Sequence, residues 1–66
     1  MKVRINGEDR ELSEGTTLAR LVADLGLSGR RLAIELNRSV VPREQWEETE
    51  LHEGDRVEIV HFVGGG

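Results

Sequence analysis

The chain has 66 residues, a net charge of −4 and no cysteine. A chain of this length buries only about 60% of the surface that its unfolded form exposes, so a deep catalytic cleft is excluded and a binding module or a substrate of larger proteins is expected. The missing cysteines exclude disulfides and thiol nucleophiles, and they fit a cytoplasmic protein. The acidic balance without a basic stripe argues against nucleic-acid binding, and no apolar run approaches the ~20 residues of a membrane span.

The first two predicted strands form a hairpin. Residues 2–5 alternate polar and apolar side chains, which is typical of a half-buried strand. Asn6 and Gly7 follow at once, and this pair is typical of a type I′ turn, whose two central residues need positive φ. Residues 8–12 are therefore the predicted return strand. Because a strand begins this early in the chain, no signal peptide is expected.

A helix is predicted next. Thr16 or Thr17 caps its start, and four apolar residues then recur at the i, i+3, i+4, i+7 spacing of one helix face. These four residues are Leu18, Leu21, Val22 and Leu25. Gly26 follows where a left-handed residue commonly ends a helix. In so small a domain, the apolar stripe is expected to pack on a sheet.

The second half of the chain reads as three strands separated by turns. The predicted strands are residues 32–36, 40–41 and 56–62. Pro42 stops the short middle strand, because proline belongs at an edge or a strand end. Trp46 is expected to plug the core beneath the following loop. Residues 37–39 and 53–55 are the predicted turns.

These elements predict one α+β domain over residues 1–66, in which a mixed sheet of four or five strands carries one helix across one face. The first and last strands are expected to pair in parallel in the middle of the sheet. That placement comes from knowledge of the β-grasp fold and not from the sequence pattern. The predicted core consists of Val3, Ile5, Leu18, Leu21, Val22, Leu25, Ile34, Val57 and Ile59.

The sequence contains no catalytic set of its own. His52 and His61 have no further His or Cys beside them, so no metal site is predicted, and the loop serines lack a local histidine. The acid-rich residues 44–53 are interpreted as solvated surface, with electrostatic steering toward a basic partner as the alternative. The one candidate chemical group is the carboxylate of Gly66.

A glycine tail suits delivery of this carboxylate to another protein. Gly64, Gly65 and Gly66 carry no Cβ, so they can enter a passage that is too narrow for a side chain. Residues 63–66 are expected to be flexible, and in extended form they reach roughly 13–14 Å from the last strand. A frayed end or a linker is the plain alternative.

An apolar pair beside the tail predicts a docking face. Val57 and Ile59 are expected to face the helix, so Val60 and Phe62 point to the opposite side of the sheet. Exposed apolar groups of this kind often mark a partner site. Val63 is assigned to the same face, and the alternative is a half-covered strand end.

Three segments carry a family resemblance: Ala33-Ile34-Glu35-Leu36-Asn37, then Val40-Val41-Pro42-Arg43-Glu44-Gln45-Trp46, and finally Phe62-Val63-Gly64-Gly65-Gly66. Further matching positions are Leu51, Gly54-Asp55 and Val57-Glu58-Ile59-Val60. With these residues the whole chain resembles the ThiS sulfur carriers of bacterial thiamine biosynthesis, which have a ubiquitin-like β-grasp fold. Arg38-Ser39 departs from the family, which commonly has Gly or Arg with an acid there. The tail has three glycines where the family needs two.

The resemblance implies a carrier that is not itself an enzyme and binds no cofactor. A ThiF-like activating enzyme would use ATP to adenylate the Gly66 carboxylate. Persulfide sulfur from a cysteine desulfurase would then replace the adenylate and leave a Gly66 thiocarboxylate. A ThiG-like thiazole synthase would take this sulfur into the thiazole ring of thiamine.

Other functions stay open beside this one. The chain could be a thiocarboxylate carrier for another pathway, similar to the small subunit of molybdopterin synthase. It could also be a ubiquitin-like modifier that is joined through Gly66 to lysines of other proteins. A third class is a plain interaction domain with an inert tail, for which loss of Gly66 would be harmless.

Overall fold

One mixed five-stranded sheet organises residues 1–62, the part of the chain that this computed structural model describes. Its strands are β1 (Lys2–Ile5), β2 (Glu8–Glu11), β3 (Leu32–Leu36), β4 (Ser39–Val40) and β5 (Arg56–His61). The remaining elements are the helix α1 (Leu18–Asp24) and the short 3-10 helix η1 (Arg43–Gln45). The predicted α+β class is confirmed. Neither helix within residues 1–62 is long and apolar enough to cross a bilayer.

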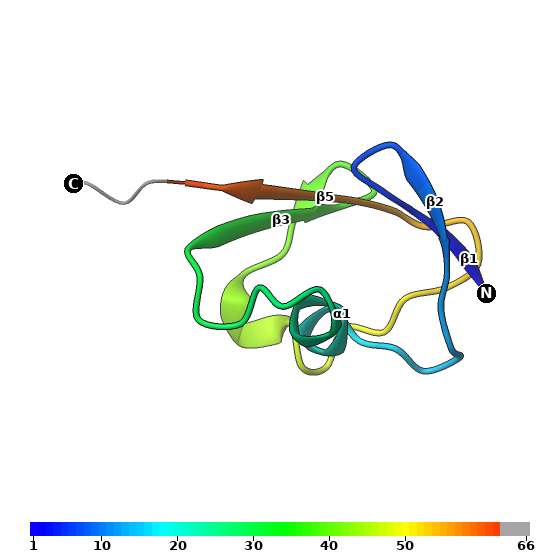
Figure 1. Ribbon diagram of the computed structural model, residues 1–66, viewed down its shortest axis with the longest axis horizontal. Coiled ribbons are helices and arrows are strands. Elements are labelled where there is room, and N and C mark those ends of the chain that lie inside the picture. The colour runs from blue at the N-terminus through cyan, green and yellow to red at the C-terminus, as the bar shows by residue number, and fades with distance from the viewer. Residues whose placement is uncertain (63–66) are drawn as a thin grey trace.

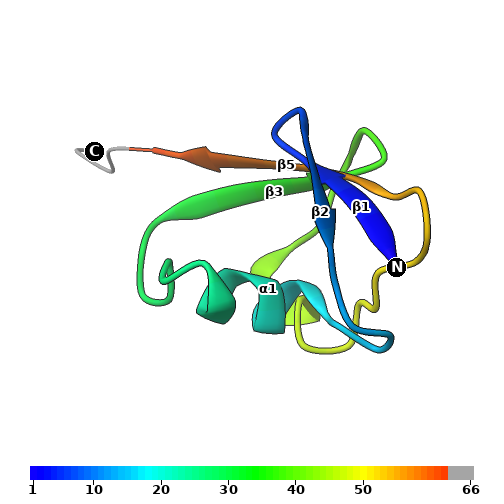
Figure 2. The same cartoon turned by 45° about the vertical axis from the view of Figure 1, so that its right-hand side comes forward.

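The strands lie in the order β2-β1-β5-β3-β4, so the last strand occupies the middle of the sheet. β1 and β5 are parallel, with Arg4 opposite Arg56 and Ile5 opposite Val57, whereas the other pairs are antiparallel. This confirms the parallel pairing that was expected for the first and last strands. Figures 1 and 2 show α1 lying across one face of the sheet, while the opposite face carries no helix.

The first hairpin turns at Asn6 and Gly7, as predicted. Their φ angles are 49° and 84°, and these positive values are what a type I′ turn requires. The return strand β2 ends at Glu11, one residue before its predicted end. Leu12 then packs half-buried against the core.

Thr17 is the residue that caps α1. Its side-chain oxygen accepts a 3.1 Å hydrogen bond from the backbone N–H of Arg20, which would otherwise have no partner in the first helical turn. Thr16 has a different role: it is buried, and its hydroxyl donates a 2.7 Å hydrogen bond to the carbonyl of Ser13. Gly26 holds φ 74° after the helix, as predicted.

The predicted core residues are all buried except Leu25, which is half-buried. The helix ends at Asp24, so Leu25 closes the helix and does not belong to its inner stripe. Trp46 plugs the core as predicted, with 5% of its surface exposed. Leu32 and Leu51 are also buried and extend the core beyond the predicted set.

The second hairpin contains a two-residue turn, which shifts the short strand β4 by one residue. Asn37 and Arg38 hold φ angles of 50° and 73°, so β4 covers Ser39–Val40 and not residues 40–41 as predicted. Asn37 fixes this turn to β5, because its side-chain oxygen accepts a 2.9 Å hydrogen bond from the backbone N–H of Arg56. Arg38 is a non-glycine residue in the left-handed region, where a Cβ is unfavourable.

The segment after Pro42 forms η1, which was not predicted from the sequence. Arg43 stacks on the Trp46 ring at 4.6 Å from its centroid, and its Nη2 donates a 2.7 Å hydrogen bond to the carbonyl of Arg30. The indole Nε1 of Trp46 donates a 2.9 Å hydrogen bond to the carbonyl of Val41. These contacts give the Val-Pro-Arg…Trp segment a structural role, because they fasten it beneath the sheet.

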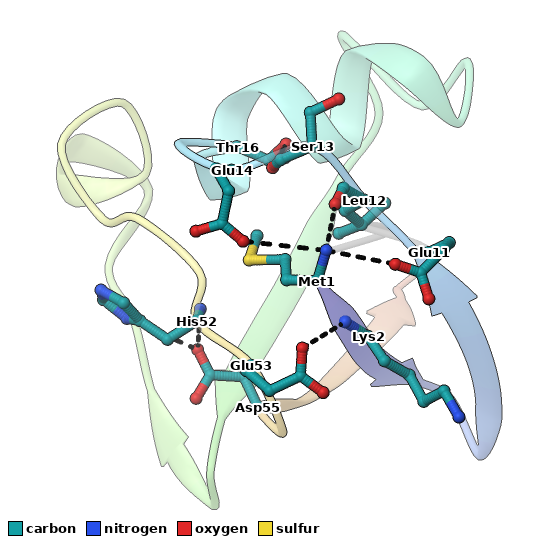
Figure 3. A network of polar contacts seen from close by, with 10 residues as sticks. All are labelled: Met1, Lys2, Glu11, Leu12, Ser13, Glu14, Thr16, His52, Glu53 and Asp55. Carbon is teal, nitrogen blue, oxygen red and sulfur yellow. Dashed lines mark hydrogen bonds and ion pairs between the residues drawn. The ribbon is translucent and has the colours of Figure 1, made fainter.

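The α-amino group of Met1 is held by a polar network (Figure 3). It donates a 2.7 Å hydrogen bond to the carbonyl of Leu12 and lies 3.2 Å from a carboxylate oxygen of Glu11 and 3.8 Å from one of Glu14. The hydrogen bond to Glu11, with the charges of nearby acids, raises the pKa of this amino group above 8.0, although desolvation opposes the shift. The network ties β1 to the segment that follows β2.

Candidate functional site

The open face of the sheet carries the apolar pair that the sequence singled out. Alternation along β5 turns Val57 and Ile59 toward α1, and both are buried. Val60 is 57% exposed and Phe62 is 51% exposed. The predicted exposure of these two side chains is therefore confirmed, and their role in docking stays a prediction.

Val40 is a third exposed apolar residue of this face, and the sequence did not assign it to the site. It is 68% exposed and lies opposite Glu35 in the β3–β4 pair. Ala33, two residues before Glu35, lies opposite Val60 of β5. The same register therefore puts Val40 and Val60 on one side of the sheet. The position of Val40 on this face follows only from the pairing of β4 with β3 and of β3 with β5. The local sequence around Val40 does not indicate it.

Beyond the apolar residues, charged side chains surround a shallow hollow of about 560 Å³ on this face. The hollow is lined by Arg4, Gly7, Glu35, Arg38, Arg56, Val57 and Glu58. Glu35 and Glu58 stand directly opposite each other on β3 and β5. Arg4 pairs with Asp9 of β2 at 3.4 Å. The face thus combines apolar groups near the end of β5 with charges of both signs near its beginning.

The other candidates from the sequence lie away from this face or stand alone. His52 is exposed, and its Nδ1 lies 4.0 Å from a carboxylate oxygen of Asp55. His61 is also exposed, at the end of β5. Among residues 1–62, no group of three or more His, Cys, Asp or Glu side chains is placed to hold a metal ion. The acids at positions 44, 47, 48, 50 and 53 are all exposed.

Val63, Gly64, Gly65 and Gly66 lie outside the described residues. The tail and its terminal carboxylate therefore stay predictions. What the structure describes is the strand that leads to them. Figure 1 shows that β5 runs from the middle of the sheet toward the side of the molecule opposite the N-terminus. The backbone N–H of Phe62 still donates a 3.1 Å hydrogen bond to the carbonyl of Arg31, so the chain is anchored up to that residue.

Comparison with known proteins identifies the family. A model of the ThiS family matches residues 3–66. The chain belongs to the ThiS family. The sulfur carrier protein ThiS of Bacillus subtilis is 37% identical over 65 residues, which cover 97% of this chain and 98% of that protein. The crystal structure of the thiamine biosynthesis protein ThiS from Geobacter metallireducens matches with a TM-score of 0.86 and 30% identity, and the match covers 100% of both chains.

The match to this ThiS structure confirms the β-grasp fold, a mixed five-stranded sheet with one helix. A second kind of relative is longer. The thiazole synthase of Paramagnetospirillum magneticum is 41% identical over 66 residues, and a thiazole synthase of Magnetococcus marinus is 42% identical over 66 residues. The chain spans only 20% of the length of each of these two proteins. A ThiS-like sequence thus forms a part of proteins that are named thiazole synthases.

Proposed function

We propose that this ThiS-family protein is a sulfur carrier whose Gly66 carboxylate is the group that carries sulfur for thiazole formation in thiamine biosynthesis. A ThiF-like enzyme joins the carboxylate to the α-phosphate of ATP, and pyrophosphate leaves. The persulfide sulfur of a cysteine desulfurase then displaces AMP, and a thiol cleaves the resulting acyl disulfide to leave a thiocarboxylate. A ThiG-like thiazole synthase receives this sulfur.

The observation that carries the proposal is the family match, which extends through the glycine tail to residue 66. A carboxylate is a poor electrophile, and adenylation turns it into a reactive acyl group with a good leaving group. A glycine leaves the carbonyl unhindered. The carrier contributes the reacting group and a surface for docking, and the enzymes contribute catalysis.

The position of β5 supports the proposal that the carrier docks on its partners and leaves catalysis to them. β5 pairs with β1 on one side and with β3 on the other, so its position in the sheet is fixed by hydrogen bonds on both sides. Val60 and Phe62 are exposed on the open face at the same end of the strand. A partner that contacts them would hold the carrier close to the point where the tail begins. Such a contact supplies the positioning on which catalytic geometry depends.

The chemical role of Gly66 is tested by changing the tail. Deletion of Gly65 and Gly66 shortens the reach by about 7 Å, and Gly66→Val keeps the reach but adds a branched side chain beside the reacting carbonyl. Both variants are expected to keep the stability of the parent and to lose ATP–pyrophosphate exchange with the ThiF-like enzyme. Intact mass should show one oxygen replaced by sulfur in the parent only. A truncated protein that is sulfurated at the parent rate would refute the proposal.

The docking role of the open face is tested by Phe62→Asp. The side chain is half exposed and lies beyond the last residue of β5, so the substitution should leave the fold intact. It should slow adenylation, because a charge would replace the apolar contact at the interface. Ser28→Asp adds the same charge at an exposed loop position and is the matched control. Equal adenylation rates for the two variants would show that Phe62 does not contact the activating enzyme.

A further inference from the structure

Two glutamates stand opposite each other in the middle of the open face. Glu35 of β3 is in register with Glu58 of β5, and both side chains are exposed. Residues directly opposite in an antiparallel pair have Cβ atoms about 4.5–5.5 Å apart, and like charges at this spacing destabilise a sheet. The ion pairs within residues 1–62 include neither carboxylate. Two negative charges thus lie side by side without a cationic partner in this part of the chain.

Exposed apolar side chains border the glutamate pair on two sides. Val40 of β4 lies opposite Glu35, and Val60 lies two residues beyond Glu58 on β5. The strand order β5-β3-β4 places β3 between the two valines. A protein surface that covers Val40 and Val60 together must therefore also cover Glu35, which lies between them.

Covering these carboxylates has a consequence for the partner. Removing an ionised carboxylate from water is strongly unfavourable unless a cation and hydrogen bonds replace the water, and the penalty exceeds the gain from covering one valine side chain. A purely apolar partner surface would therefore bind this face poorly. The face favours a partner that places positive charge at the glutamate pair.

Three arginines line the same hollow but do not form ion pairs with the glutamates. Arg4 pairs with Asp9 at 3.4 Å. Arg38 and Arg56 take part in none of the ion pairs found among the described residues. Arg56 lies two residues before Glu58 on the same side of β5, so a swing of its side chain onto Glu58 is the alternative to a cation from the partner. This alternative predicts that loss of the glutamate charges leaves docking unchanged.

We propose that the ThiF-like enzyme places a cationic side chain between Glu35 and Glu58 when it docks on the open face. Arginine suits this position, because its five N–H donors lie in one plane and can reach both carboxylates, while its hydrocarbon stem passes over Val60. The hollow of about 560 Å³ beside the glutamates is open to such a side chain. The inference rests on the proposed function, in which adenylation is the first step that requires the carrier to dock.

A second copy of the chain fits the face less well. A symmetric pair would match the glutamates of one copy with Arg38 and Arg56 of the other. Such a pair sets the two β5 strands antiparallel, because Arg56 precedes Glu58 along the strand. Val60 and Phe62 of each copy would then lie beyond the start of the other copy's β5, away from its exposed apolar side chains. These apolar groups would stay uncovered, so we assign the face to the enzyme.

The double variant Glu35→Gln/Glu58→Gln tests the proposal, because it keeps the shape of both side chains and removes both charges. Glu47→Gln/Glu48→Gln is the matched control: it changes the net charge equally at two exposed residues that follow η1, away from the open face. The glutamine pair at 35 and 58 should raise KM for the carrier in ATP–pyrophosphate exchange at least tenfold, since the cation of the enzyme would lose its partners at the covered interface. The value of kcat should stay at the parent level.

Urea unfolding separates docking from folding. The double variant at 35 and 58 should unfold at or above the midpoint of the parent, because the like-charge repulsion across the sheet is removed. A merely structural role for the glutamates would lower the midpoint instead. Added NaCl should raise KM of the parent more steeply than KM of this variant, because salt screens an ion pair that the variant lacks.

Each other outcome has a defined meaning. A KM at or below the parent value for the double variant at 35 and 58 would overturn the proposal, because the enzyme then brings no cation to the glutamates. Self-association of the carrier alone in sedimentation, if it is lost in this variant, would assign the face to a second copy and overturn the proposal as well. If the parent itself is not adenylated, the proposed function fails and the inference falls with it. If the parent is adenylated and the variant keeps its KM, only the inference fails.

Discussion

Asn6 is expected to stabilise the fold in two separable ways. Its backbone adopts φ 49° in the first turn, and its side chain forms hydrogen bonds with the N–H and the C=O of Ile59 beyond the end of β1. Asn6→Gly removes the two hydrogen bonds and tolerates the positive φ. Asn6→Ala removes the same bonds and in addition places a Cβ in the left-handed region.

The magnitudes follow from these contacts. Two partly buried hydrogen bonds contribute about 1–3 kcal/mol net, which is the expected loss of unfolding free energy for Asn6→Gly. The left-handed strain adds about 1–2 kcal/mol for Asn6→Ala. A chain of this length has a total stability of about 3–10 kcal/mol. The alanine variant is therefore expected to lose a large part of its stability, and the order is parent, glycine, alanine.

Urea unfolding followed by tryptophan fluorescence measures these losses, since Trp46 is the only tryptophan and is buried. The midpoint should fall in the stated order while the m-value stays constant, because the surface that unfolding exposes hardly changes. If Asn6→Gly unfolds at the parent midpoint, the bonds to Ile59 contribute nothing to stability. If the alanine and glycine variants coincide, the positive φ carries no cost at this position, and the reasoning about the turn is wrong.

Two further predictions concern the second turn and the N-terminus. Arg38→Gly should raise the unfolding free energy by about 0.5–2 kcal/mol, because glycine relieves the strain of φ 73°. Ser39→Gly in β4 is the control and should lower the unfolding free energy. If urea unfolding shows that both variants are less stable than the parent, the reasoning about strain at Arg38 is wrong. The raised pKa of the Met1 amino group means that the ammonium stabilises the fold fully below about pH 8, and that this contribution disappears as the pH rises through the raised value. The Nα-acetylated protein should therefore have a lower Tm than the free protein at pH 7, and the difference in Tm between the two proteins should become smaller at high pH. A Tm difference that does not change with pH would argue against the ion pair with Glu11.

Most of the fold could be predicted from the sequence, because turns, the apolar face of the helix and strand alternation depend on residues that are close together in the chain. Asn6 and Gly7 tolerate positive φ, so the first hairpin was predictable. The apolar stripe at Leu18, Leu21 and Val22 fixed the inner face of α1, because the helical period places these residues together. The exposed side of β5 followed from strand alternation in the same way. Each of these predictions needs only neighbouring residues and a known period.

Several features of the site depend on contacts between distant segments. Val40 joins the open face through the register of three strands, which the sequence does not reveal. The turn at Asn37 and Arg38 shortens the second hairpin because a side-chain bond to Arg56 holds it, and the local pattern could not anticipate that bond. The half-burial of Leu25 reflects where α1 ends.

The sequence alone determined which segments form strands, which helix face is apolar and, through family resemblance, the ThiS assignment. The tertiary structure decided where β1 stops relative to β5: the strand pairing ends at Ile5 opposite Val57, and the side chain of Asn6 then bonds to the backbone of Ile59. The hydrogen-bond partners of β5 come from β1 and β3, which are far from it in the sequence. Pairing of Asn6 with Ile59 spans 53 positions, and no local propensity encodes a contact of that range. The edges of a sheet are consequently known only once the strands have been assembled.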